Sequence, residues 1–282
     1  MSAPADFAYG AANAALGLND PERLREIIPV AIGNGTLART ILTYPNRPDS
    51  APAAWLLAWP SPDHGLMSFI GAGKNGGARQ WEISWPFSHA GIEHDFEIVD
   101  VYHDEDVPEI RLYEGIVGGH RLTVFDTYCE GCFSLIGVDD YWRTRIGGWA
   151  SWLRRGSTEP HRFTPEQVSP DMREAFRETF EAEGVLVIHT DQLVSLFPAG
   201  HRASPLYELR SPVEAVRDGP PVLDMPSWIL TVMIAREDPT IDAAETDVSI
   251  ELTVTAESWR ETTLPQVGDV VEGVVWLQAE FV

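Results

Sequence analysis

Lysine is almost absent from this sequence, since Lys74 is the only one and the other 19 basic residues are arginine. Basic residues as a whole are scarce, because 20 Lys and Arg stand against 43 Asp and Glu, for a formal net charge of −23 at pH 7. General nucleic-acid binding needs clustered cations that meet phosphate groups. The composition therefore excludes that class of function.

Cysteine and long apolar runs are also scarce. Two cysteines in 282 residues exclude a disulfide scaffold and favour a cytoplasmic location. No run approaches the roughly 18 uncharged apolar residues of a membrane helix. The stretch from Met1 to Leu18 has neither the basic start nor the compact apolar segment of a secretory signal. We therefore expect no membrane association.

Recognisable catalytic motifs are missing as well. The sequence has no G-x-S-x-G nucleophile elbow. Its carboxylates are so numerous that no pair of them is distinctive as an acid and base. The sequence thus favours a protein without catalytic activity, and it predicts no cofactor other than the divalent metal considered below.

What the sequence does contain is a series of short apolar and aromatic runs, separated by Gly, Pro and Asn clusters, from about residue 36 to residue 152. Such runs predict strands. Ser169, Pro170 and Asp171 predict a helix start, and Met172, Phe176 and Phe180 then fall on one helical face before Gly184. We expect a β-rich α+β fold of antiparallel sheets or small barrel-like lobes, with one main helix (about 169–183) between them.

The expected organisation has four parts. Residues 1–18 form a loosely ordered N-terminus, residues 19–157 a β-rich N-terminal lobe, residues 158–204 a helix–strand connector and residues 205–282 a β-rich C-terminal lobe. A short helix is predicted to begin at Pro21 and to end at Pro29.

A faint internal similarity links the two lobes. Leu122-Thr123-Val124 precedes Trp149 in the first lobe, and Leu252-Thr253-Val254 precedes Trp276 in the second. A chance match between two strand segments is the favoured interpretation. If the similarity is genuine, each segment belongs to the closing half of a five-stranded barrel of the oligonucleotide- or oligosaccharide-binding type.

Residues 142–162 invert the charge of the chain, because Glu159 is their only acid. Arginine forks bind carboxylates and phosphates, and tryptophan rings stack on sugars or bases. The favoured interpretation is an edge strand whose arginines pair with the protein's own acids. The alternative is a site for an anionic small ligand or a saccharide, made by Trp142, Arg143, Arg145, Trp149, Trp152, Arg154 and Arg155.

Histidines and acids are dense between residues 89 and 106. Imidazole and carboxylate groups hold divalent cations, which activate water in hydrolases. The metal candidates are His89, His94, Asp100, His103 and Asp104. However, His94 and His103 are an odd number of positions apart, so an unbroken strand points them to opposite faces. A solvated acidic loop is therefore favoured over a metal site.

Cys129 and Cys132 lie between two strand-like runs and are separated by Glu130 and Gly131. This arrangement is typical of a hairpin turn. Inert thiols are the favoured interpretation. The alternatives are a redox-sensitive pair or, with His89 and His94, a structural metal site.

Taken together, these features predict a non-catalytic binding protein, with a basic protein as its partner and an acidic surface that sets specificity and association rate. A metal-dependent hydrolase using the His94–Asp106 cluster and a ligand-binding module using residues 142–162 are the two alternatives. The sequence leaves the oligomeric state open.

Overall fold

The computed structural model of the chain describes residues 5–18, 20–42, 52–71, 79–132, 136–191, 193–200, 203–236 and 247–282. Strands predominate, and the helices are few and short. The expected β-rich α+β class is therefore confirmed. None of the helices in these ranges is long and apolar enough to cross a membrane.

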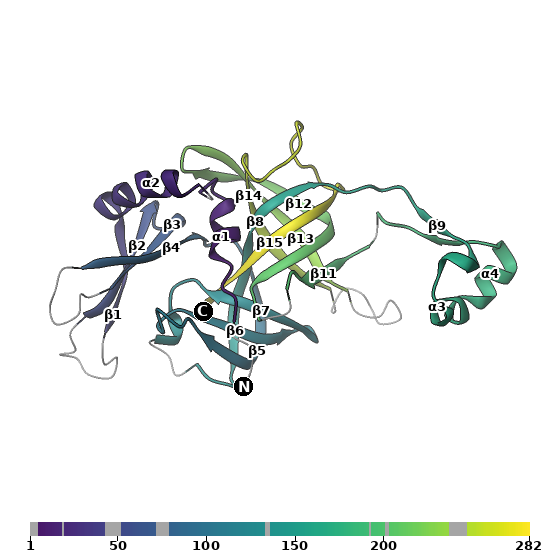
Figure 1. Cartoon of the computed structure of the whole chain (residues 1–282), viewed down its shortest axis with the longest axis horizontal. Helices are drawn as coiled ribbons and strands as arrows, with labels where there is room; N and C mark the ends of the chain where they lie inside the picture. The colour runs from purple at the N-terminus through teal and green to yellow at the C-terminus, as the bar shows by residue number, and fades with distance from the viewer. Residues whose placement is uncertain are drawn as a thin grey trace.

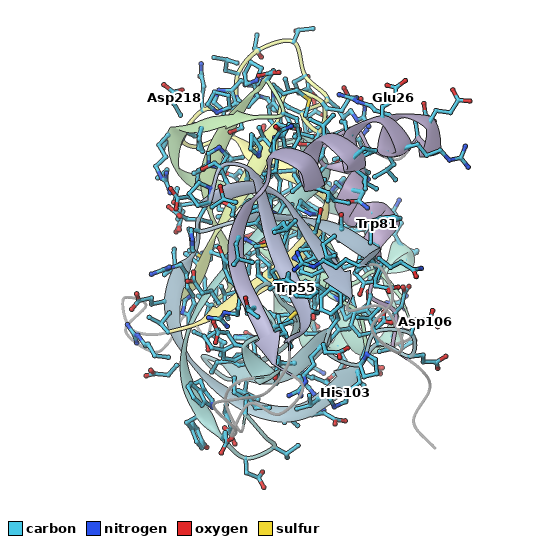
Figure 2. All side chains as sticks on the ribbon, turned by 90° about the vertical axis from the view of Figure 1, so that its left-hand side faces the viewer. Glu26, Trp55, Trp81, His103, Asp106 and Asp218 are labelled. Carbon is cyan, nitrogen blue, oxygen red and sulfur yellow. The ribbon has the colours of Figure 1, made fainter. Side chains whose placement is uncertain are left out.

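A four-stranded antiparallel sheet is formed by the first part of the chain, in the order β1-β2-β3-β4. Its strands are β1 (Thr36–Leu42), β2 (Pro52–Pro60), β3 (His64–Gly71) and β4 (Gln80–Ser88). One face of β2 and β4 buries Leu56, Trp85 and Phe87 against the rest of the molecule. Figure 2 shows this sheet in front, with the labelled Trp55 over its strands and Glu26 on the helix above it.

A nine-stranded mixed sheet forms the centre of the molecule, in the order β11-β12-β13-β14-β8-β15-β7-β6-β5 (Figure 1). Its first four strands along the chain are β5 (Ile92–His103), β6 (Arg111–Val117), β7 (His120–Asp126) and β8 (Tyr141–Arg155). The others are β11 (Ser195–Pro198), β12 (Leu206–Val222), β13 (Met225–Ala235), β14 (Val248–Thr255) and β15 (Val270–Phe281).

Two closed cycles of strand pairings share β8 and β15. Additional β8–β5 and β12–β15 pairings close them, so that one cycle is β5-β6-β7-β15-β8 and the other is β12-β13-β14-β8-β15. In each cycle, three consecutive antiparallel strands are closed by two long strands. One is the strand that follows them in the chain, β8 after β7 or β15 after β14, and the other is the long strand of the other cycle. The strands of residues 92–155 and those of residues 195–281 therefore belong to one hydrogen-bonded sheet, whereas β1–β4 of the predicted N-terminal lobe form the separate four-stranded sheet.

The internal similarity in the sequence corresponds to equivalent places in these two cycles. Trp149 of β8 and Trp276 of β15 are direct partners in the antiparallel β8–β15 pairing, at the centre of the arrangement. On either side of them, β7 runs parallel to β15 and β14 runs parallel to β8. The segments Leu122–Val124 and Leu252–Val254 thus occupy matching strands of the two cycles, and the five-stranded barrel stays a prediction.

Glycines permit the close strand contacts that this sharing requires. A Cβ on Gly147 of β8 would lie 2.2 Å from the carbonyl oxygen of Ala90, and a Cβ on Gly273 of β15 would lie 2.1 Å from that of Trp152. A side chain at either position would force neighbouring backbones apart. Glycine is therefore required where a shared strand meets its neighbours.

The N-terminal segment is docked, in contrast to the loose order expected for residues 1–18. Its described part, residues 5–18, includes α1 (Tyr9–Ala14) and buries Leu16 and Leu18 completely. The indole Nε1 of Trp276 donates to the carbonyl oxygen of Phe7 at 3.1 Å, and Thr255 Oγ1 donates to that of Ala15 at 2.7 Å. The segment covers the centre of the β8–β15 pairing, because the buried tryptophans there need an apolar cover.

The first long helix also differs from the expectation. It is α2 (Pro21–Asn34), with Pro29 inside it, and the side chain of Asp20 accepts a hydrogen bond from the backbone N–H of Glu22 at its start. Proline removes one helical donor but does not have to end a helix that is held by tertiary contacts. Packing of α2 against β2 and β3 provides those contacts.

The main helix predicted at 169–183 is two short helices, α3 (Pro170–Ala175) and α4 (Arg177–Glu183), separated at Phe176. Ser169 caps α3 as expected, with its Oγ accepting from the Met172 N–H at 3.3 Å. Neither helix lies between two lobes, since both are at the end of a projection from the central sheet (Figure 1). Only Phe180 of the predicted apolar face is buried, so little packing holds the two helices in one line.

Candidate binding surface on the arm and at its base

Residues 157–190 leave the central sheet after β8 and return to it before β11. They contain β9 (His161–Phe163), α3, α4 and β10 (Leu186–Ile188), and β9 pairs antiparallel with β10. These elements pack chiefly against one another, and Figure 1 shows them extended to the right of the body. We call residues 157–190 the arm.

Arg210 of β12 fixes the two ends of the arm to the body. Its Nη2 donates to the carbonyl oxygens of Ser157 and Thr190, the latter at 3.1 Å. Thr190 Oγ1 in turn donates to the carbonyl oxygen of Ser157 at 3.1 Å. The two chain segments that enter and leave the arm are therefore side by side.

The arm carries an acidic surface and one exposed aromatic ring. It holds seven acids against three arginines. Glu178, Glu181 and Glu183 are exposed on α4. Phe176, which is 42% exposed, lies between α3 and α4. An aromatic ring beside a group of like charges combines the two contact types that protein interfaces use, apolar anchoring and electrostatic steering.

A patch of the sheet beside the base of the arm is formed by two cross-strand rows. Strand register places one residue of β11, β12, β15 and β8 in each row. The polar row is Ser195, Arg210, Glu272 and Arg154, and the mixed row is Phe197, Glu208, Val274 and Trp152. All of these except Arg154 line an open pocket of about 420 Å³. We call these eight residues the base patch.

Two ion triplets flank the central tryptophan pair, and their charges are reversed. In the base patch, Glu272 pairs with Arg154 and with Arg210, each at 2.7 Å. On the other side of the pair, Arg145 contacts Glu280 at 2.8 Å and Glu93 at 3.4 Å. Each triplet joins three neighbouring strands of one cycle, so its charges are satisfied across the sheet.

The remaining arginines of the segment 142–162 on β8 are paired in the same way. Arg143 contacts Glu93 at 3.3 Å and Asp95 at 3.2 Å. Arg155 contacts Asp269 at 2.9 Å and donates to the carbonyl oxygen of Leu264. The arginines thus pair with the protein's own acids. However, β8 is a central strand that pairs with three others, and the predicted edge position is wrong.

The tryptophans of this segment have different environments. Trp149 is fully buried beside Trp276. Trp142 packs against the core, with its ring nearly perpendicular to that of Phe281 at a centroid distance of 6.3 Å. Trp152 alone lines the base pocket. Of the seven residues proposed for ligand binding, the structure places Trp152 and Arg154 in the base patch and the other five elsewhere.

The metal candidates are dispersed. In the ranges that the structure describes, no three His, Cys, Asp or Glu side chains gather as metal ligands. His94 Nε2 lies 2.9 Å from the Ser249 carbonyl oxygen, and His103 Nδ1 lies 3.1 Å from that of Pro108. Asp104 accepts from the N–H groups of Asp106 and Val107, as expected for an acidic turn, and the Asp100 carboxylate accepts from the N–H of Val101. Strand alternation along β5 separates these groups.

His89 is paired with Glu280, at 2.9 Å from its Nδ1, where the end of β4 meets β15. The hydrogen bond to Glu280 is the main cause that raises the pKa of His89, and burial opposes it. Burial likewise opposes ionisation of Glu280, but the hydrogen bond and charge of His89, with the charge of Arg145, lower its pKa. The Tyr128 ring stacks on the imidazole at a centroid distance of 5.3 Å.

This pair predicts a pH dependence of stability. Because the pKa of His89 is raised, its stabilising contribution is complete below the unfolded value of about 6.5 and is lost as the pH rises through the folded value. We expect the change in melting temperature between pH 6 and pH 8 to be smaller in His89→Gln than in the wild-type protein. Thermal unfolding in matched buffers measures it, and an unchanged difference contradicts it.

The two cysteines do not form the predicted hairpin. Cys129 is buried and at positive φ, and a 3₁₀ helix (Glu130–Cys132) follows it. The side chain of Cys132 lies outside the described residues. The buried carboxylate of Asp126 accepts from the N–H groups of Glu130 and Gly131, at 2.9 and 3.0 Å, and fixes this turn. Burial raises the pKa of Asp126 to about 6, against those hydrogen bonds.

Sequence reasoning missed most of the base patch, including Arg210, Glu272, Glu208 and Phe197. These residues come from strands that are separated along the chain by the arm and by the C-terminal meander. Each one is an ordinary residue in its local sequence. The only available signal was the tryptophan and arginine content of β8, which pointed to Trp152 and Arg154.

Comparison with known proteins gives no relative at any level: the chain matches no family model, no curated protein and no solved structure.

Proposed function

We propose that this protein is a non-catalytic binding protein and that the arm is the contact element for a basic protein partner. The observation that carries the proposal is the projection of the arm from the body, with its acids and Phe176 exposed. A segment that packs chiefly against itself contributes little to the core. Its surface is therefore accessible to a partner on several sides.

Charge supports a basic partner. The whole chain carries −23, and the arm shares that sign. An extended acidic surface speeds the encounter with a basic protein and disfavours acidic ones. The exposed glutamates of α4 meet the partner first, and the interaction is weakened by salt, since the Debye length is only about 8 Å at physiological ionic strength.

An apolar contact supplies the part of the affinity that salt does not weaken. Phe176 is the exposed large apolar residue of the arm helices. Aromatic rings at the centre of an interface contribute a large share of the binding energy. We propose that Phe176 inserts into an apolar depression on the partner while the glutamates surround it.

The body of the protein supports the arm at its base. We infer that the two strand cycles are the small barrel-like lobes expected from the sequence and that they hold the arm base in one orientation. A cytoplasmic location, suggested by the low cysteine content, belongs to the same proposal.

Affinity purification from a native lysate tests the proposal. The wild-type protein is expected to retain a basic protein at low salt and to release it at high salt. The variant Glu178→Gln, Glu181→Gln, Glu183→Gln is expected to weaken retention by at least about tenfold, because each lost charge contributes a fraction of a kcal/mol to a few kcal/mol at an interface.

A second triple variant is the matched control. Glu105→Gln, Asp106→Asn and Asp218→Asn remove the same number of charges from the body, where Figure 2 shows the labelled Asp106 and Asp218. This variant is expected to retain the partner as the wild-type protein does. If both variants lost the partner equally, net charge alone would explain the effect. If the α4 variant retained the partner as the wild-type protein does, the assignment of the contact to the arm would be overturned.

A further inference from the structure

The base patch has a second set of properties that the proposed contact with a protein partner does not use. Its pocket of about 420 Å³ is within the size range of small-ligand sites. It opens on one face of four hydrogen-bonded strands, so its side chains are held at fixed spacings. The row from Phe197 to Trp152 crosses three strand intervals, which places the two rings roughly 14 Å apart along the sheet.

The two aromatic rings stand at opposite ends of this row. Phe197 is 63% exposed and lies on β11, next to Glu208 in the register. Trp152 on β8 lines the same pocket from the other end. Rings at this spacing provide two separate stacking faces rather than one closed cage. They suit an elongated ligand with more than one apolar face.

The charges of the base patch cancel. Arg154 and Arg210 both pair with Glu272 at 2.7 Å, and Arg210 is further occupied by the carbonyl oxygens at the base of the arm. Glu208 has no ion pair among the residues that the structure describes. With two arginines and two glutamates the patch has no net charge. The patch as a whole therefore gives neither an anionic nor a cationic ligand a net electrostatic attraction.

The base patch, which is neutral as a whole, provides both donors and acceptors of hydrogen bonds. Glutamate oxygens accept, arginine N–H groups donate, and Ser195 can do both. Sugar hydroxyl groups require mixed donors and acceptors of this kind, and the C–H faces of pyranose rings pack on aromatic rings. We propose that the base patch binds a neutral oligosaccharide, with sugar rings on Trp152 and Phe197 and hydroxyl groups on Glu208.

Titration with neutral tetrasaccharides tests this proposal. The probes are maltotetraose, cellotetraose and chitotetraose, and the readouts are calorimetry and tryptophan fluorescence. We expect saturable binding of at least one probe, and at least a fivefold loss of affinity in Phe197→Ala and in Trp152→Ala. Phe197 is exposed, so its replacement keeps the test valid even if Trp152→Ala fails to fold.

Trp81→Ala is the matched control. Trp81 is also partly exposed, but it lies on β4 in a separate pocket beside α2. The Trp81→Ala variant is expected to bind the probe as tightly as the wild-type protein does. The proposal would be overturned if none of the three probes binds, or if both base-patch variants bind a probe as tightly as the wild-type protein does. Tighter binding of glucose 6-phosphate than of any neutral probe would also overturn it. None of these outcomes bears on the binding of the protein partner by the arm.

Discussion

Replacing Trp276 by alanine is expected to lower the free energy of unfolding by about 3–5 kcal/mol, the range for large aromatic side chains removed from a core. Trp276 is fully buried, lies opposite Trp149 in the β8–β15 pairing, and donates a hydrogen bond to the carbonyl oxygen of Phe7. The substitution leaves a cavity at the centre of both strand cycles and removes one of the hydrogen bonds that hold the N-terminal segment.

Urea unfolding followed by circular dichroism measures this effect. Phe197→Ala is the control, because Phe197 is 63% exposed. It is expected to change the free energy of unfolding by no more than about 0.5 kcal/mol. A loss below about 1 kcal/mol for Trp276→Ala, which is typical of an average substitution, would contradict the central position of this residue.

Replacing residues 158–189 by a short Gly–Ser linker is expected to remove partner binding and to leave the body folded. The ends of the arm are already adjacent, since Thr190 Oγ1 donates to the carbonyl oxygen of Ser157 at 3.1 Å. Arg210 can keep its contacts to both ends. Because the whole proposed contact is lost, we expect affinity for the purified partner to fall by at least about 100-fold, or about 2.7 kcal/mol.

The control experiment measures whether the variant without the arm remains as stable as the wild-type protein. Urea unfolding is expected to give a midpoint close to that of the wild-type protein, since the arm packs chiefly against itself. Calorimetry with the purified partner then measures the loss of binding. Undiminished affinity in a folded variant without the arm would show that the partner binds elsewhere.

Local sequence patterns predicted many of the strands, for a physical reason, but not the long β12, which contains Pro212, Pro220 and Pro221. In β14, Val248 and Ile250 alternate with the more accessible Ser249 and Glu251, as expected for a strand with one buried face. From Leu252 onward both faces are buried, and Thr255 Oγ1 donates to the carbonyl oxygen of Ala15 in the N-terminal segment at this end of the strand. Alternation specifies which side chains turn inward but not which strand lies alongside.

The sequence therefore did not show that β8 and β15 are shared between the two cycles, although it contained the similarity between the two halves. Trp149 and Trp276 are far apart in the chain, and only the pairing shows that they are partners. The division of the predicted helix at Phe176 has a similar origin, because the spacing of Met172, Phe176 and Phe180 indicates a helical face but not whether a core exists to bury it. Local patterns do not contain that information.

The candidate site was predictable in part. The unusual Trp and Arg content of β8 led to Trp152 and Arg154, and the abundance of acids led to the expectation that the arginines are paired. The acids that pair with them, such as Glu272 and Glu280, could not be chosen from 43 acidic residues without the strand register.

Hydrogen exchange of the protein with and without its purified partner tests whether the arm is the contact element. We predict slower amide exchange in α3 and α4, around Phe176, and unchanged exchange in the four-stranded sheet β1–β4. Protection confined to β1–β4 or to the β13–β14 hairpin, with the arm exchanging as fast as in the free protein, would contradict it.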